Sequence, residues 1–135
     1  MFRLSPTMPV MKTAHIASIG LGKTKIITIF DKTQFQELAM GLQLSNRPFL
    51  WVVRPDITDK INDAYPEVFT NRVVSRGHIV SWAPQHKVLA HPSIACFISH
   101  CGWNSTIEAI SNGVLFLCWP YFTDQMHNEN YICIV

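Results

Sequence analysis

The sequence predicts an α/β fold in which a parallel sheet carries helices on both of its faces. Four short apolar segments predict the strands, namely residues 49–53 (FLWVV), 78–82 (HIVSW), 94–99 (IACFIS) and 114–118 (VLFLC). Segments with helical spacing or helix-start signals separate them. Strands that are buried on both faces are continuous apolar runs, and their alternation with helices is typical of a parallel, doubly wound sheet.

The first predicted helix has one apolar face. Thr33 and Gln36 form a capping-box pattern at its start. Its apolar residues recur three or four positions apart and are Phe35, Leu38, Ala39 and Leu42. Asn46 and Pro48 end the helix, and residues 54–72, which contain several Pro, Asp and Asn, predict mostly loop.

Three further helices follow from local start and stop signals. Pro84 stands at a plausible first helical position and opens a short helix that ends at residue 89. Residues 105–111 predict the next helix, and Gly113 follows it as a typical C-terminal signal. Thr123 is placed to cap a last helix that begins at the following residue.

Length and composition limit the classes of function. A chain of 135 residues with 48% hydrophobic and 15% charged residues fits one domain. The net charge of +2, with no Lys/Arg cluster, argues against a nucleic-acid partner, and no apolar run approaches the roughly 20 residues that span a bilayer. Because no secretion signal is present, we expect a cytoplasmic protein whose cysteines are free thiols. These cysteines are Cys96, Cys101, Cys118 and Cys133.

Both ends of the sequence are unusual for a complete domain. Residues 1–30 have no clean strand or helix period, and residues 131–135 (YICIV) lie inside a helical pattern that has no cap. We therefore expect an atypical leader at residues 1–27 and an incomplete domain at residues 28–135 that is truncated at its C-terminus.

Within the leader, residues 17–24 (ASIGLGKT) fit a relaxed phosphate-loop pattern. Such a loop needs a strand before it and a helix after it, so that backbone N–H groups surround a phosphate. Here the preceding strand signal is weak and the following residues are strand-like. Nucleotide binding at this segment is thus a remote alternative.

Three loops between predicted strands and helices are rich in polar residues, and ligands of open α/β sheets bind at such loops. They read SWAPQ, SHCGWNS and WPYFTDQ. In the middle loop, Gly102 allows a ligand to approach the backbone, and the N–H groups of Asn104, Ser105 and Thr106 begin a helix. This arrangement favours an anion, most simply a phosphate, and His100 adds a donor or a positive charge.

Structural explanations compete with this interpretation. Ser105 and Glu108 satisfy the S-x-x-E capping box, so the loop is also explained as a helix cap alone. Trp82 and Trp103 are also explained as apolar residues at strand ends that complete the core.

Cysteine chemistry is disfavoured at the same loop. Cys96, His100 and Cys101 lie close in sequence, but there is no C-x2-C pair, so buried free thiols are a better interpretation than a metal site. His100 and Cys101 are sequence neighbours that point to opposite sides, which argues against a nucleophilic thiol.

Taken together, the loops closely resemble the signature box of plant UDP-dependent glycosyltransferases that modify small secondary metabolites. The resemblance rests on WAPQ at 82–85, HCGWNS at 100–105, Glu108, WP at 119–120 and DQ at 124–125. The upstream segment FDKTQFQELAMGLQLSNRPFLWVVRP also resembles this family, so that the resemblance covers about residues 28–135. It implies a GT-B fold of two facing Rossmann-like halves, of which this chain is part of the C-terminal, donor-binding half.

The resemblance also implies roles for individual residues. Trp82 stacks on uracil, the backbone of Ala83 and Gln85 contacts the base edge, and Glu108 binds the ribose hydroxyls. The diphosphate is held by His100, Asn104, Ser105 and the backbone of Gly102. The sugar hydroxyls are held by Trp103, Asp124 and Gln125. The final Gln favours glucose.

These roles agree with elementary chemistry. A carboxylate accepts two vicinal hydroxyl donors without a metal. When the bond to UDP breaks, helix N–H groups and His100 are placed to stabilise the charge that grows on the diphosphate, as a divalent ion does elsewhere. We therefore expect an inverting, metal-independent transferase with a small-molecule acceptor and no cofactor, since the UDP-sugar is a co-substrate.

The sequence departs from the family in three respects. Leu115 replaces a usual proline, which is expected to loosen the loop, and HIASIGLGKTKII replaces the usual opening strand and Gly/Ser loop. The half that carries the acceptor pocket and the catalytic histidine is absent, so no catalytic residue is assigned. We expect the chain alone to be inactive, and the alternative is a non-catalytic, truncated UDP-binding or unstable fragment.

Overall fold

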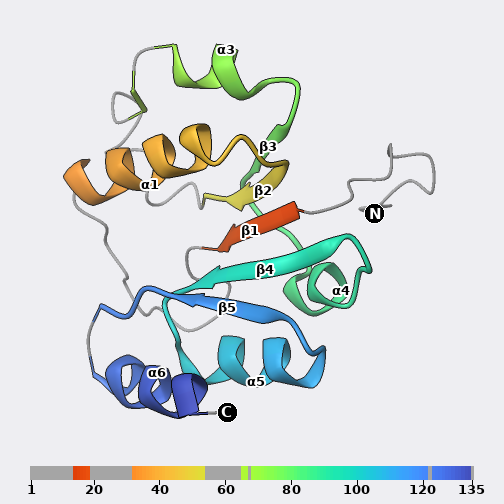
Figure 1. The fold of residues 1–135 in the computed structure, drawn as a ribbon, viewed down its shortest axis with the longest axis vertical. Helices are drawn as coiled ribbons and strands as arrows, with labels where there is room; N and C mark the ends of the chain where they lie inside the picture. Colours follow the sequence, from red (N-terminus) through yellow and green to blue (C-terminus); the bar gives the residue numbers. More distant parts are fainter. Residues whose placement is uncertain (1–13, 19–31, 54–64, 67, 122, 135) are drawn as a thin grey trace.

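A computed structural model describes residues 14–18, 32–53, 65–66, 68–121 and 123–134. Among these residues the strands form one parallel five-stranded sheet with the order β3-β2-β1-β4-β5 (Figure 1). The strands are β1 (Ala14–Ser18), β2 (Phe49–Val52), β3 (Gly77–Val80), β4 (Ile94–Ser99) and β5 (Leu115–Cys118). The helices are α1 (Lys32–Leu44), α3 (Phe69–Val73), α4 (Gln85–Leu89), α5 (Trp103–Ser111) and α6 (Asp124–Ile134).

Strand β1 corrects the expectation that HIASIGLGKTKII replaces the usual opening strand, because the start of this segment is itself a strand. It lies at the centre of the sheet, where His15 is in register with Phe49 of β2 and Ala17 with Ile98 of β4. The segment AHIAS has only one β-branched residue, so its local pattern is weak, and hydrogen bonding on both sides makes it a strand. The other residues of 1–27 lie outside the described residues, as do positions 19–24 of the phosphate-loop pattern.

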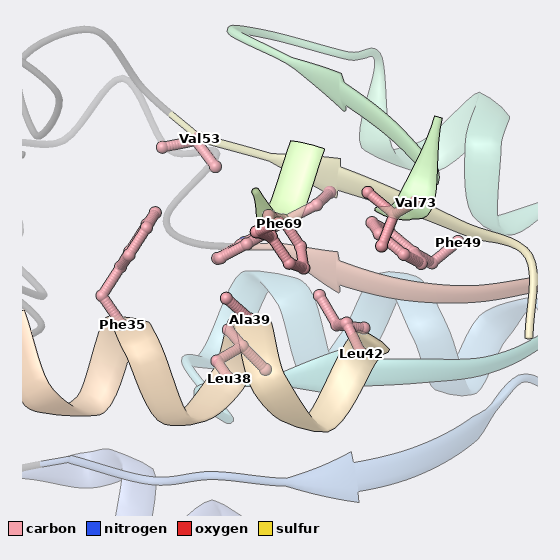
Figure 2. Packing of buried hydrophobic residues seen from close by; sticks show 9 residues of the cluster. Phe35, Leu38, Ala39, Leu42, Phe49, Val53, Phe69 and Val73 are labelled. Carbon is pink, nitrogen blue, oxygen red and sulfur yellow. The ribbon is translucent and has the colours of Figure 1, made fainter. Parts of the chain in front are cut away.

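One face of the sheet is covered by α1 and α3. The apolar face predicted for α1 is confirmed, since Phe35, Leu38, Ala39 and Leu42 are all buried. Figure 2 shows these side chains pointing from α1 toward residues of β2 and α3. Helix α3 was not predicted, because its five residues fall in a segment interpreted as loop, but its Phe69 and Val73 are buried one turn apart in the same cluster.

The opposite face is covered by α4 and α5. Val52 of β2, Phe97 of β4 and Ala109 of α5 belong to one buried cluster on this face. Trp51, next to Val52 in β2, instead belongs to the cluster under α1, as expected for a strand whose successive side chains point to opposite faces. The prediction of a parallel sheet with helices on both faces is therefore confirmed.

The strand order places three loops at one edge of the sheet. From β1 the chain adds β2 and β3 on one side, and β4 and β5 on the other. Because all strands are parallel, the loops that follow β3, β4 and β5 leave from the same edge, where open α/β sheets bind ligands. Strand β3 ends two residues earlier than predicted, which leaves Trp82 in the loop.

Leu115 lies within β5 rather than in the loop that its replacement of proline was expected to loosen. It is in register with Cys96 of β4. The turn before it contains Gly113, whose φ of 63° lies in the left-handed region that glycine adopts without strain, as predicted for the end of this helix.

A pair of glycines offers a test of this packing. A Cβ added to Gly77 would lie 2.5, 2.9 and 3.0 Å from Cζ, Cε1 and Cε2 of Phe49, whereas a Cβ on Gly41 of α1 meets nothing within 4 Å. Gly77→Ala should lower the free energy of unfolding by about 1–3 kcal/mol through overpacking. Gly41→Ala, the matched control, should raise it by about 0.5–1 kcal/mol because alanine favours the helix. Urea denaturation measures both changes, and equal effects would contradict the packing at Gly77.

Candidate functional site

The loop between β4 and α5 is fixed by buried hydrogen bonds. Cys101 adopts a left-handed conformation with φ 64°, and its N–H donates to Oγ of Ser99 at 3.1 Å. Its carbonyl oxygen accepts a hydrogen bond from Nδ2 of Asn128 in α6 at 2.9 Å. Ser99 and Cys101 are fully buried. Both polar groups of this strained residue are thus held by side chains.

Helix α5 begins at Trp103, two residues earlier than predicted. Gly102 precedes the helix without any side-chain capping hydrogen bond, and Thr106 N–H donates to the Gly102 carbonyl oxygen at 2.9 Å. The amides of residues 103–105 consequently have no acceptor within the helix. The capping-box explanation of Ser105 and Glu108 is wrong, because both residues lie inside the helix.

The side chains of Ser105 and Glu108 are bound by a residue of another helix. Nε2 of Gln85, the first residue of α4, lies 2.9 Å from Oε2 of Glu108 and 3.2 Å from Oγ of Ser105. Packing of α4 against α5 on the same face of the sheet brings these residues together. A carboxylate, a hydroxyl and an amide therefore meet at the N-terminal end of α5.

A pocket of about 570 Å³ lies between these two helices. Seven of the residues predicted to bind a donor line it, namely Trp82, Ala83, Gln85, Trp103, Asn104, Ser105 and Glu108. The indoles of Trp82 and Trp103 are 60% and 59% exposed, so the explanation that they complete the core is wrong. The pocket combines exposed aromatic faces with a carboxylate and the first amides of a helix.

His100 packs against Gly102 outside the residues that line the pocket. A Cβ on Gly102 would overlap Nε2 of this imidazole, so a larger residue at position 102 would displace the His100 side chain. Burial lowers the pKa of His100, while the negative charge of Asp124 acts in the opposite direction. The imidazole is therefore mostly neutral at pH 7, a state that suits it to hydrogen bonding rather than to acting as a cation. Its Nδ1 is buried and has no partner among the described residues.

The last two predicted residues begin α6. Asp124 is exposed, and its Oδ1 accepts a hydrogen bond from Oγ1 of Thr123 at 2.9 Å. Gln125 is only 2% exposed, and its Oε1 accepts a hydrogen bond from the Tyr121 N–H at 2.8 Å. The side chain of Gln125 thus helps to fix the loop between β5 and α6.

Sequence reasoning missed Asn128, which links this part of the structure to the loop before α5. Its Nδ2 lies 3.2 Å from Oδ2 of Asp124, one helical turn earlier, as well as 2.9 Å from the Cys101 carbonyl oxygen. An Asp and an Asn four residues apart on a predicted helix were a signal for the first contact. Nothing local predicted the second.

The cysteines are free, as expected. Burial, together with a hydrogen bond involving Cys118, raises the pKa of Cys101 to about 12. A thiol with such a pKa is protonated at neutral pH, which agrees with the interpretation that Cys101 is not a nucleophile. Among the described residues no group of three or more His, Cys, Asp or Glu side chains is arranged to hold a metal ion.

Comparisons with known proteins identify plant relatives of this chain. Linamarin synthase 1 from Manihot esculenta is 48% identical over 109 residues, covering 81% of this chain and 23% of that protein. DIMBOA UDP-glucosyltransferase BX8 from Zea mays is 50% identical over 106 residues, covering 78% of this chain and 23% of its own length. The chain thus spans about a quarter of the length of these relatives.

No membrane-spanning helix occurs among the described residues.

Solved structures show the same similarity. The crystal structure of UDP-glucose:anthocyanidin 3-O-glucosyltransferase in complex with UDP superposes with a TM-score of 0.76 at 31% identity, covering 90% of this chain and 25% of that one. Os79 from O. sativa in complex with UDP gives a TM-score of 0.76 at 37% identity, covering 93% of this chain and 26% of that one. These are GT-B glycosyltransferases, and the present fold corresponds to about a quarter of theirs. The family model described as UDP-glucoronosyl and UDP-glucosyl transferase matches residues 14–134, and the chain belongs to this family.

Proposed function

We propose that this chain supplies the UDP-sugar site of a glycosyltransferase that moves a hexosyl group, with glucose favoured, to a hydroxyl of a small molecule. The observation that carries the proposal is the pocket where an exposed indole and a carboxylate meet the first amides of α5. Both solved structures named above contain UDP, and the similar maize enzyme is a UDP-glucosyltransferase by name.

The nucleoside would occupy the side of the pocket formed by α4. The exposed face of Trp82 suits stacking on a pyrimidine, and the adjacent residues Ala83 and Gln85, whose backbone would contact the base edge, line the same pocket. Glu108 would accept hydrogen bonds from the two ribose hydroxyls. Only one of its oxygens is bound by Gln85 in the structure, and a carboxylate has about four acceptor positions, so the ribose and Gln85 can be bound together.

The diphosphate would lie at the N-terminal end of α5. The amides of residues 103–105 and the helix dipole favour an anion there, next to the side chains of Asn104 and Ser105. His100, mostly neutral at pH 7, would act as a hydrogen-bonding group. As the glycosidic bond to UDP breaks, these groups would stabilise the negative charge on the leaving diphosphate, which supports a metal-independent mechanism.

Trp103 and Asp124 would contact the transferred sugar, because both side chains are exposed near the start of their helices. Gln125 is expected to contribute less directly. Its Oε1 accepts a hydrogen bond from the Tyr121 N–H, so its side chain already supports the loop between β5 and α6. In an inverting transfer, the acceptor oxygen would attack the anomeric carbon from the side opposite UDP while a base removes its proton. We assign no residue of this chain to that base.

Calorimetry with UDP tests the nucleotide site. Glu108→Ala should weaken UDP binding about 10- to 100-fold, because hydrogen bonds to a charged group contribute about 1.5–3 kcal/mol. Glu37→Ala is a matched control that removes an exposed carboxylate from α1, on the opposite face of the sheet. Equal binding by the two variants would contradict the ribose role of Glu108, and no binding by the unaltered chain would contradict the proposed function.

The protonation of His100 is measurable by NMR. We expect the imidazole to titrate below its ordinary pKa of 6.5, because burial disfavours the charged form. Asp124→Asn should lower the pKa further, since it removes the negative charge that favours the imidazolium. Glu37→Gln, which removes a distant carboxylate, should leave it unchanged. A His100 pKa above 6.5, or one that rises in Asp124→Asn, would show that the site is wrongly described.

Transfer activity separates an enzyme from a UDP-binding unit. With UDP-glucose and a phenolic acceptor, we expect the chain alone to give no glucoside above the protein-free rate, because no residue in it is assigned as the base. Mass spectrometry of the acceptor measures this. Product that forms with the unaltered chain and disappears in Glu108→Ala would overturn the expectation while supporting the donor site.

A further inference from the structure

We infer that Asn128 is a positioning residue of the donor site, because its side-chain amide fixes the loop before α5 and the carboxylate of Asp124 relative to each other. The inference rests on the proposed function, in which that loop receives the diphosphate and Asp124 receives the sugar. Asn128 would contact neither ligand group itself.

The amide nitrogen of Asn128 is fully used by these two contacts. Nδ2 lies 2.9 Å from the Cys101 carbonyl oxygen and 3.2 Å from Oδ2 of Asp124. A primary amide nitrogen has two N–H donors, so each contact takes one of them. The side chain is only 7% exposed, which limits competition from water. The two contacts therefore act as one rigid link.

The first contact fixes an unfavourable turn. Cys101 is a non-glycine residue with φ 64°, a conformation that must be held by its surroundings. Ser99 binds its N–H and Asn128 binds its carbonyl group. Without Asn128 the carbonyl group would be buried and unpaired, and the turn that directs Gly102 and the first amides of α5 would lose one of its two supports.

The second contact fixes the direction of the Asp124 carboxylate. Thr123 donates to Oδ1 of Asp124, and Asn128 donates to Oδ2. An exposed aspartate would otherwise sample several rotamers, and this conformational entropy would be lost when the carboxylate binds a sugar hydroxyl. With both oxygens held, Asp124 is oriented before the ligand arrives.

The inference predicts a distinct pattern of binding losses. Loss of the Asn128 amide should weaken the binding of UDP, because the loop before α5 is less well held. It should weaken the binding of UDP-glucose further, because the Asp124 carboxylate is no longer oriented. In addition, the effect of replacing Asn128 should depend on whether Asp124 is present, because one residue acts through the other. Replacement of a residue that only stabilises the fold would lower the affinity for both ligands equally, whether or not Asp124 is present.

Asn128→Leu removes both donors at similar size, and Asn130→Leu is the matched control because Asn130 is exposed on the same helix. Calorimetry of the full chain with UDP and with UDP-glucose, at a temperature where circular dichroism shows each variant folded, measures the dissociation constants. We expect Asn128→Leu to weaken the binding of UDP-glucose about 10-fold or more and the binding of UDP by a smaller factor. Asn130→Leu should change either dissociation constant by less than about 2-fold. If Asn128→Leu does not fold, Asn128→Asp, which keeps the shape and turns the donor into an acceptor, takes its place with Asn130→Asp as control.

A double-mutant cycle with Asp124→Ala completes the test. We expect the combined loss of UDP-glucose affinity to be smaller than the product of the two single losses. Equal losses for UDP and UDP-glucose, or losses that multiply, would overturn the inference while leaving the donor site intact. A failure of the unaltered chain to bind UDP would overturn the donor site and the inference together.

Discussion

The parallel direction of the five strands is the constraint on which the candidate site depends. It brings the loops after β3, β4 and β5 to one edge, so residues that are distant in sequence become neighbours. Gln85 contacts Glu108 across 23 residues, and Asn128 contacts Cys101 across 27. If β3 or β4 ran in the opposite direction, the loop that follows it would lie at the far edge, and the pocket between α4 and α5 would lose one wall.

Two side-chain amides join the three loops, and their burial suggests different uses. Gln85 lies at the pocket and is only partly buried, so a ribose that approaches Glu108 can share or replace its hydrogen bond. Asn128 is buried and lies outside the residues that line the pocket, and it supports a left-handed residue. The first contact is therefore suited to exchange on binding, and the second is suited to preorganisation. Together they hold the surroundings of residues 103–105, where we propose that the diphosphate binds.

The sequence predicted the fold where the local pattern and the tertiary structure agree. The buried face of α1 followed from the spacing of its apolar residues, and the resemblance located seven residues that line the pocket. Prediction failed where long-range contacts decide. AHIAS becomes a strand through its two neighbours, and Ser105 and Glu108 form no capping box because α5 begins at Trp103. The contact of Asn128 with a carbonyl group in another loop has no periodic signature at all.

Amide chemical shifts during a UDP titration test the account most directly, because they show residue by residue which parts of the chain are affected by UDP. The account predicts that the largest changes occur at residues 82–86 and 102–108, including the indole N–H signals of Trp82 and Trp103, with little change in α1 and α3. Changes centred on α1 and α3, or a spectrum that UDP leaves unaltered, would contradict the claim that the N-terminal end of α5 is a nucleotide-sugar site.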